Sequence, residues 1–245
     1  MLFRFSAVVL ALALPVVAVE TAYAQQPSIQ QVGAAAQANL NALVEGSPTV
    51  LPRGTAEATK GSPYADSRWL PARLRMSNNV PLAPVPLKYD VLNQRLLMRP
   101  VNRPNDSLQL DSRLLLSFEL EDAAAGAPRK RTFRRFSEAP TPSQQGEFVE
   151  VLHEGKHVLL KRYAKTLRKA DYQGAYSTDR RYDEIEDKTT YFLKRPNGTL
   201  VPVKLSLKAL QAAAPELAPA LKAAPNATSA KTDAEWAAVL AAADK

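Results

Sequence analysis

The residues best suited to chemistry stand together at positions 153 to 157, where two histidines flank a glutamate. His153-Glu154-Gly155-Lys156-His157 matches H-E-x-x-H, the signature of zinc peptidases. That chemistry requires a helix, because only positions i and i+4 of one helical face bring both imidazoles to the same zinc ion. The flanking residues 148–152 and 158–163 are instead β-branched, alternating runs joined through a glycine, which predicts a hairpin. A zinc peptidase is therefore only a remote alternative.

The rest of the chain offers few partners for such a site. It contains only two histidines and no cysteine, so a third zinc ligand at standard spacing, a thiol nucleophile and a disulfide are all missing. The acidic run at 183–187 lacks the residue order and the glycine of a calcium loop. Neither a P-loop, a G-x-S-x-G elbow nor a dinucleotide-binding glycine pattern occurs. We expect no catalytic residue, no metal ligand and no cofactor.

Basic residues form the other candidate site. The formal net charge is +8, and much of the excess lies in residues 129–135 and 156–169. Such clusters can bind the phosphate or sulfate groups of a glycan or lipopolysaccharide. The alternative, which we prefer, is a solvated strand face; aromatics that would stack on bases are not regularly interleaved, which also argues against nucleic acid. The candidate polyanion-binding residues are Arg129, Lys130, Arg131, Arg134, Arg135, Lys161 and Arg162.

The elements that must position these residues are predicted to be strands. Short β-branched and aromatic runs, separated by turn residues, fill 147–163 and 189–204, and apolar and charged residues alternate along them. This pattern is typical of antiparallel hairpins with one buried face. We expect a mainly β fold over residues 61–204, with a curved, sandwich-like or half-barrel-like antiparallel sheet. Its candidate core residues are Trp69, Leu87, Leu97, Leu115, Phe118, Val149, Val151, Leu159, Tyr191, Leu193 and Val203.

Local signals refine this prediction. Pro71, Pro84 and Pro86 have no N–H to donate to a ladder, so the strands that contain them should lie at a sheet edge or carry a bulge. The segment 179–187 is so charged that we expect a solvated turn. Residues 205–245 show helical periodicity, and Thr232 with Glu235 forms a capping box that predicts a final helix over residues 233–243.

The N-terminal region indicates export. Arg4 precedes an apolar run, and Ala22-Tyr23-Ala24 fits the small-x-small rule, so residues 1–24 are predicted to be a cleaved signal peptide. The mature chain would begin at Gln25 and carry no transmembrane segment. Residues 25–60 are rich in alanine, glutamine and proline, which predicts a flexible arm with a short helix near residues 34–44. We expect a periplasmic or extracellular protein.

Several segments follow one another in a recognisable order: Gly61-Ser62-Pro63-Tyr64, Trp69, Val85–Asp90, Phe148–Lys161, Arg181-Tyr182, Thr190-Tyr191 and Leu200–Leu205. Over about residues 60–224 this order resembles a family of uncharacterised, signal-peptide-bearing proteins of Gram-negative bacteria. The resemblance implies a single secreted or periplasmic β-rich domain with a helical tail, and it implies no activity, ligand or catalytic residue.

Together these observations favour a protein that is not an enzyme. We expect an exported envelope or secreted interaction module that contacts a protein or a glycan through its edge strands and loops. The identity of that partner does not follow from the sequence. Polyanion binding through the basic residues is the alternative.

Overall fold

The structure is a computed structural model that describes residues 29–44, 59–100, 104–123, 129–170 and 182–245. The predicted signal peptide, residues 1–24, lies outside the described residues. The described strands are β1 (Thr59–Lys60), β2 (Leu70–Met76), β3 (Val85–Asp90), β4 (Arg95–Met98), β5 (Leu108–Leu110), β6 (Leu115–Asp122), β7 (Arg129–Arg135), β8 (Phe148–Glu154), β9 (Val158–Arg162), β10 (Lys165–Arg168), β11 (Asp183–Asp187), β12 (Thr190–Lys194) and β13 (Leu200–Val203). The α-helices are α1 (Ile29–Val44), α2 (Leu207–Ala213), α3 (Ala218–Ala223) and α4 (Asp233–Ala243), with short 3-10 turns at Ser112–Leu114, Pro142–Gln144 and Pro215–Leu217.

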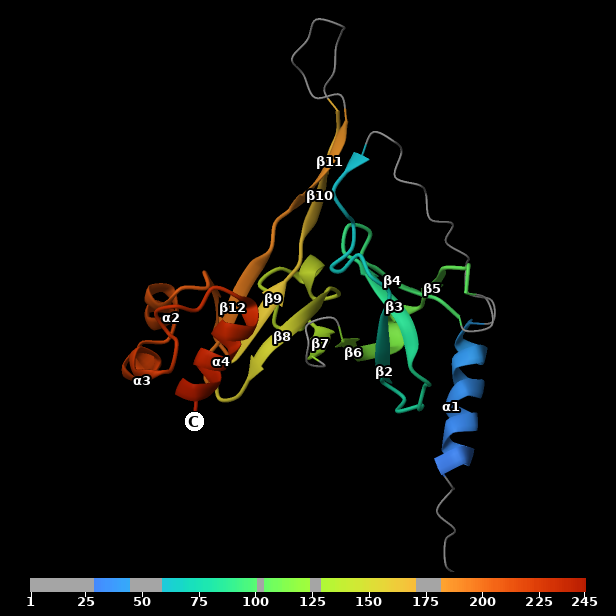
Figure 1. Ribbon diagram of the computed structural model, residues 1–245, viewed down its shortest axis with the longest axis horizontal. Coiled ribbons are helices and arrows are strands. Elements are labelled where there is room, and N and C mark those ends of the chain that lie inside the picture. The colour runs from blue at the N-terminus through green and yellow to red at the C-terminus, as the bar shows by residue number, and fades with distance from the viewer. Residues whose placement is uncertain (1–28, 45–58, 101–103, 124–128, 171–181) are drawn as a thin grey trace, which may run out of the picture.

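Ten of these strands form one antiparallel sheet, in the order β13-β12-β9-β8-β7-β6-β2-β3-β4-β5. The sheet bends strongly, and α2 to α4 gather at its β12 end (Figure 1). Its two outermost strands, β5 and β13, do not pair with each other, so the sheet is open and does not close into a barrel. The prediction of a mainly β, antiparallel fold with a helical C-terminal end is confirmed.

One row of directly opposed residues crosses the sheet and defines its inner face. Directly opposed residues of an antiparallel pair point to the same side. The row starts apolar, turns charged on β8 and β9, and becomes apolar again on β13. From β2 to β13 it reads Leu74, Phe118, Phe133, Glu150, Lys161, Tyr191 and Val203.

The first buried cluster fills the inner face over β2 to β7. Its centre is aromatic: Phe118 and Phe133 stack with their ring centroids 4.7 Å apart, and Tyr89 and Phe148 contact Phe118 edge-on. Leu40 of α1 belongs to the same cluster and is 2% exposed. Burying each such side chain contributes about 1.5–3 kcal/mol, so this cluster is the main source of stability for that half of the sheet.

The second cluster lies between the inner face at β9, β12 and β13 and the C-terminal helices. Leu159 and Leu193 from the sheet pack with Leu210, Leu221 and Leu240 from α2, α3 and α4, and all five are fully buried. The predicted final helix and its capping box are confirmed, because the Thr232 and Glu235 side chains each accept from the other's backbone N–H. The helical tail is thus part of the core.

The third cluster lies on the opposite, outer face, beneath the segment 136–147. It contains Phe136, Val149, Leu160 and Phe192. Leu159 and Leu160 are therefore neighbours in sequence that are buried on opposite faces. A strand covered on both sides needs a continuous apolar run, which explains why β9 does not alternate at its centre.

The expectation for the prolines holds for one strand and is wrong for the other. Pro71 and Pro86 lie in interior strands, where they oppose each other across the β2–β3 pair. β2 carries a bulge-like register shift between Arg75 and Met76, as expected, whereas the described pairs of β3 show neither an edge position nor a shift. The two prolines are tolerated because Pro71 precedes the first residue that pairs with β6, and Pro86 precedes the first residue that pairs with β4. The supposed charged turn at 179–187 contains β11 in its described part, because Asp183–Asp187 pairs with β10.

The core prediction holds for most of its residues. Trp69, Val151 and Tyr191 are partly exposed, and the other predicted core residues are buried.

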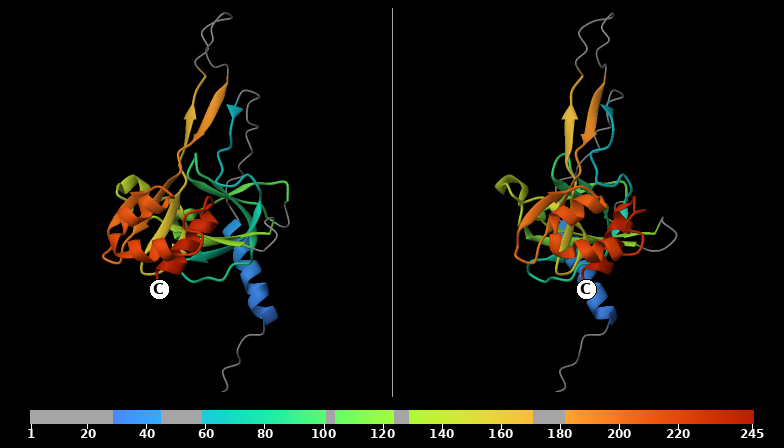
Figure 2. Two further views of the ribbon diagram at one scale, coloured as in Figure 1. Left: turned by 60° about the vertical axis from the view of Figure 1, so that its left-hand side comes forward. Right: turned by 90° about the vertical axis from the view of Figure 1, so that its left-hand side faces the viewer.

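The two strands β10 and β11, with β1 alongside, form a separate three-stranded sheet that extends away from the body (Figures 1 and 2). We call it the projecting sheet. Within the described part of the chain, no helix has the length and apolar character needed to cross a membrane.

Candidate functional site

The structure does not bring the predicted basic residues onto one surface. Because successive side chains of a strand point to opposite faces, the register divides the predicted set. Arg129, Arg131, Arg135 and Lys161 share the inner face with Phe133, whereas Lys130, Arg134 and Arg162 lie on the outer face.

Most of these cations are also neutralised within the protein. On the outer face, Arg134 pairs with Glu138 at 2.6 Å and Arg162 with Glu147 at 2.7 Å. Arg135 lies over the Phe148 ring and donates to the backbone carbonyls of Ser112 and Gly146. Lys130 is exposed. Polyanion binding through the predicted set stays a prediction, and these contacts do not favour it.

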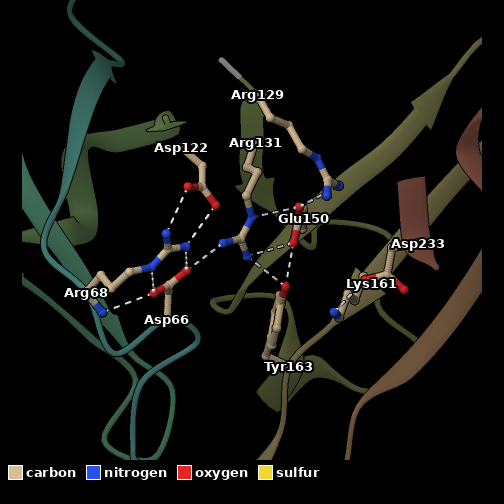
Figure 3. A network of polar contacts seen from close by, with 9 residues as sticks. All are labelled: Asp66, Arg68, Asp122, Arg129, Arg131, Glu150, Lys161, Tyr163 and Asp233. Carbon is tan, nitrogen blue, oxygen red and sulfur yellow. Dashed lines mark hydrogen bonds and ion pairs between the residues drawn. The ribbon is translucent and has the colours of Figure 1, made fainter. Parts of the chain in front are cut away.

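Three of the four inner-face cations, Arg129, Arg131 and Lys161, belong to a polar network that sequence reasoning missed (Figure 3). Glu150 of β8 is 2% exposed, and both its oxygens accept from Arg131 of β7, at 3.0 and 3.1 Å. The Tyr163 hydroxyl donates to the same carboxylate at 2.5 Å. Buried carboxylates are costly unless they are paired and hydrogen-bonded. This one has three charge-assisted or hydroxyl bonds.

The network extends in both directions from Glu150. Arg131 also contacts Asp66 at 3.1 Å, and Arg68 bridges Asp66 and Asp122 at 2.8 Å each. On the other side the Lys161 ammonium lies 4.6 Å from the Tyr163 ring centroid and pairs with Asp233 at 2.6 Å. Asp233 is the first residue of α4. The network therefore links the loop before β2 to the C-terminal helices, between the first and second clusters.

The ionisation of the network follows from these contacts. Burial and the neighbouring Glu150 carboxylate raise the pKa of the Tyr163 hydroxyl, so it remains a proton donor. Burial alone would raise the pKa of Asp233, but the hydrogen bonds from Lys161 and Tyr191 outweigh it and lower that pKa. Asp233 therefore stays charged, and Tyr163 stays neutral, at ordinary pH. This arrangement suits electrostatic support of the fold, since each acid already accepts from an internal donor.

The His153–His157 turn is a hairpin, as predicted. Phe148–Glu154 and Val158–Arg162 pair as β8 and β9, and the motif falls at their connection instead of on a helix. Both histidines contact Asp244, the residue after α4: His157 Nδ1 lies 2.8 Å from one oxygen, and His153 Nε2 lies 3.1 Å from the other. The second ring nitrogen of His157 lies 2.8 Å from Glu216. The described residues contain no cluster of His, Cys, Asp or Glu that could hold a metal ion.

Gly155 allows the chain terminus to approach this turn. A Cβ at this position would lie 2.4 Å from Asp244 Oδ2 and 2.8 Å from His153 Nε2. The His157 backbone N–H also donates to Asp244 at 2.8 Å. Burial acts to raise the pKa of Asp244, but the hydrogen bonds from His157 and His153 lower it overall. The zinc-like string is thus a docking site for the end of α4.

The projecting sheet is the second feature that the core does not explain. Leu167 of β10 is 42% exposed and directly opposes Ile185 of β11. Charged pairs surround these two apolar residues, including Lys165 with Asp187 at 2.9 Å. Gly61 adopts φ +93°, and a Cβ there would lie 2.7 Å from the Ile185 carbonyl oxygen, so glycine allows the chain after β1 to lie against β11. The result is a braced element with an apolar centre and a charged rim.

Comparisons of this chain with family models, with curated proteins and with solved structures found no match.

Proposed function

We propose that this protein is an exported, non-enzymatic interaction module of the cell envelope, and that the projecting sheet contacts its partner. The observation that carries the proposal is the projecting sheet itself. It stands clear of the body in every view (Figure 2). None of its described residues belongs to any of the three buried clusters. The packing of the core therefore does not explain why the chain forms this sheet.

The surface chemistry of the projecting sheet resembles that of a small protein interface. An apolar centre with a charged rim is the usual arrangement where two proteins bind reversibly. Leu167 and Ile185 supply the centre, and Arg168 with Glu186, 3.5 Å apart, supplies part of the rim. The pairing of three strands, with Gly61 close to Ile185, orders the backbone that carries these side chains. A pre-ordered surface loses less entropy on binding than a flexible loop.

One further observation supports a binding role over catalysis. The acids of the polar network and of the His153–His157 turn all accept from internal donors, so they serve the fold.

The proposal of export rests on the signal-peptide pattern of residues 1–24. Cell fractionation and mass spectrometry should find a soluble form that begins at or very near Gln25.

Site-specific photocrosslinking in cells tests the interaction itself. A photoreactive amino acid at position 167 should give a discrete crosslinked partner band, whereas the same group at position 114 should not. Leu114 is a fair control because it is 49% exposed but lies on the body of the protein. Leu167→Asp should remove the partner from the complex and Leu114→Asp should leave it. Equal crosslinking at both positions, or none at 167, would reject this role for the projecting sheet.

A further inference from the structure

Two cations on the outer face of the sheet share one tryptophan ring. Lys88 Nζ lies 4.9 Å from the Trp69 ring centroid and 4.7 Å from that of Tyr64, and the Arg99 guanidinium carbon lies 4.6 Å from the Trp69 centroid. Leu87 and Met98 lie in the first cluster, so strand alternation turns the neighbouring Lys88 and Arg99 to the outer face. All four side chains of the group are partly buried.

Within the described residues this pair has no counter-ion, unlike Arg68 and Arg95 nearby. Arg95, the first residue of β4, pairs with Asp90 at 2.8 Å. Arg68 pairs with both Asp66 and Asp122. Neither Lys88 nor Arg99 forms an ion pair with any described residue. The Nε of Arg99 is buried and has no hydrogen-bond partner among the described residues. A buried donor without an acceptor is costly and rare in native proteins.

The electrostatics of Lys88 and Arg99 also indicate that the two cations lack a negatively charged partner in the part of the chain that the structure describes. Burial and the neighbouring Arg99 charge both lower the pKa of Lys88, and the smaller, opposite effect of Asp66 does not offset them. Asp66 is already engaged by Arg68 and Arg131. The aromatic rings offset some of the repulsion through cation–π contacts. They cannot accept the buried Nε–H as a carboxylate or phosphate oxygen would.

We propose that Lys88 and Arg99, held over Trp69 and Tyr64, form a binding site for an oxyanion, such as a phosphate or a carboxylate group. Arginine presents its Nε and Nη donors in a planar fork that matches the oxygens of such a group, and lysine adds a second positive charge. The site lies on the body of the protein, apart from the projecting sheet, and does not depend on the role proposed for that sheet. The anion would either be free or be carried by an envelope glycan or lipid, which share this chemistry.

Tryptophan fluorescence provides a direct assay, because Trp69 contacts both cations and the only other tryptophan, Trp236, is buried in α4. The whole protein is titrated with inorganic phosphate and, separately, with acetate, with chloride replaced to keep the ionic strength constant. We expect a saturable change in emission with at least one anion. Adding a soluble glycan that carries a phosphate or a carboxylate group then distinguishes a free from a carried ligand.

The variants make the test specific. Lys88→Gln and Arg99→Gln should each weaken binding about tenfold or more, as expected for loss of a charge-assisted hydrogen bond. Arg75→Gln, which removes an exposed cation from the same face of β2, should change the affinity less than twofold. Lys88→Arg should retain binding, and thermal unfolding checks that each variant is folded. No saturable change with either anion, or equal weakening by Arg75→Gln, would overturn the proposal.

Discussion

Gly155 is the residue of the H-E-x-x-H string that allows Asp244 to approach the two histidines. A Cβ at position 155 would collide with Asp244 Oδ2, and that carboxylate would have to shift away from its bonds with His157. We predict that Gly155→Ala destabilises the protein by about 1–3 kcal/mol, the usual cost of overpacking. Gly146→Ala is the matched control, since a Cβ at position 146 would meet nothing within 4 Å. Chemical denaturation of both variants measures the difference, and equal stability would contradict the close approach.

Glu150 carries the second prediction at this scale. Glu150→Gln removes the charge that opposes Arg131, whose side chain is only 10% exposed. Breaking one partner of a buried ion pair typically costs about 3–5 kcal/mol, because the other charge remains buried. Glu121→Gln is the control: its pair with Arg73 is exposed on both sides, and such pairs contribute about 0–1 kcal/mol. If the two substitutions had the same small effect on urea unfolding, the polar network would not support the fold.

The sequence predicted these residues only in part. Alternation around Glu150 indicated a strand, but it did not show which face is buried, because Val149 and Glu150 are both buried, on opposite faces. The hairpin at His153–His157 was predictable from its flanks. Its acid partners were not, because Asp244 and Glu216 lie 87 and 59 residues from His157 along the chain. No spacing rule connects residues that only the packing of α4 brings together.

At the scale of elements, α4 is held at both ends. Asp233 at its start accepts from Lys161 and Tyr191, and Asp244 at its end accepts from the His153–His157 turn. Between them Trp236, Val239 and Leu240 are buried in the second cluster. The helix has 11 residues, too few to be stable alone in water, so these tertiary contacts must maintain it.

We predict that Asp244→Asn loosens α4 selectively. Amide exchange should become faster in α4, while the amides of β6 and β7 keep their protection. The folded-state pKa of Asp244 is depressed below 3.8. Its contribution to stability is therefore present above pH 3.8 and lost as the pH falls through the lower folded value. The stability difference between wild type and Asp244→Asn should shrink on acidification below that pH, and a difference that stayed constant down to about pH 2 would contradict the assignment.

Apart from the short β5, element prediction succeeded where an element buries at least one face in a core cluster and failed where it buries none. The capping box located α4, and the apolar runs located β8, β9 and β12. In contrast, β11 is mostly acidic because it lies in the projecting sheet, where no core demands apolar residues. Its charge therefore suggested a turn. β5 has only three residues, too short to show a period at all.

For the whole molecule, the open sheet raises the question of what protects its two edges. An unpaired edge strand is a template for pairing with another chain. β5 offers only three residues, and β13 contains Pro202, which is exposed and has no N–H to donate. Both edges are thus poor templates. This argues against the expectation that the protein contacts its partner through the edge strands of the main sheet. It favours the projecting sheet as the contact surface.

The β13 edge gives the last prediction. Pro202→Thr restores a backbone N–H and introduces a β-branched residue of high strand propensity. We expect self-association of this variant to increase with concentration, visible as a dimer or larger species in sedimentation velocity, while the wild type remains unchanged over the same range. Pro142→Thr is the control, because Pro142 starts a 3-10 turn outside the sheet. Association of both variants would point to a general loss of stability, and association of neither would show that the edge is protected by something other than its proline.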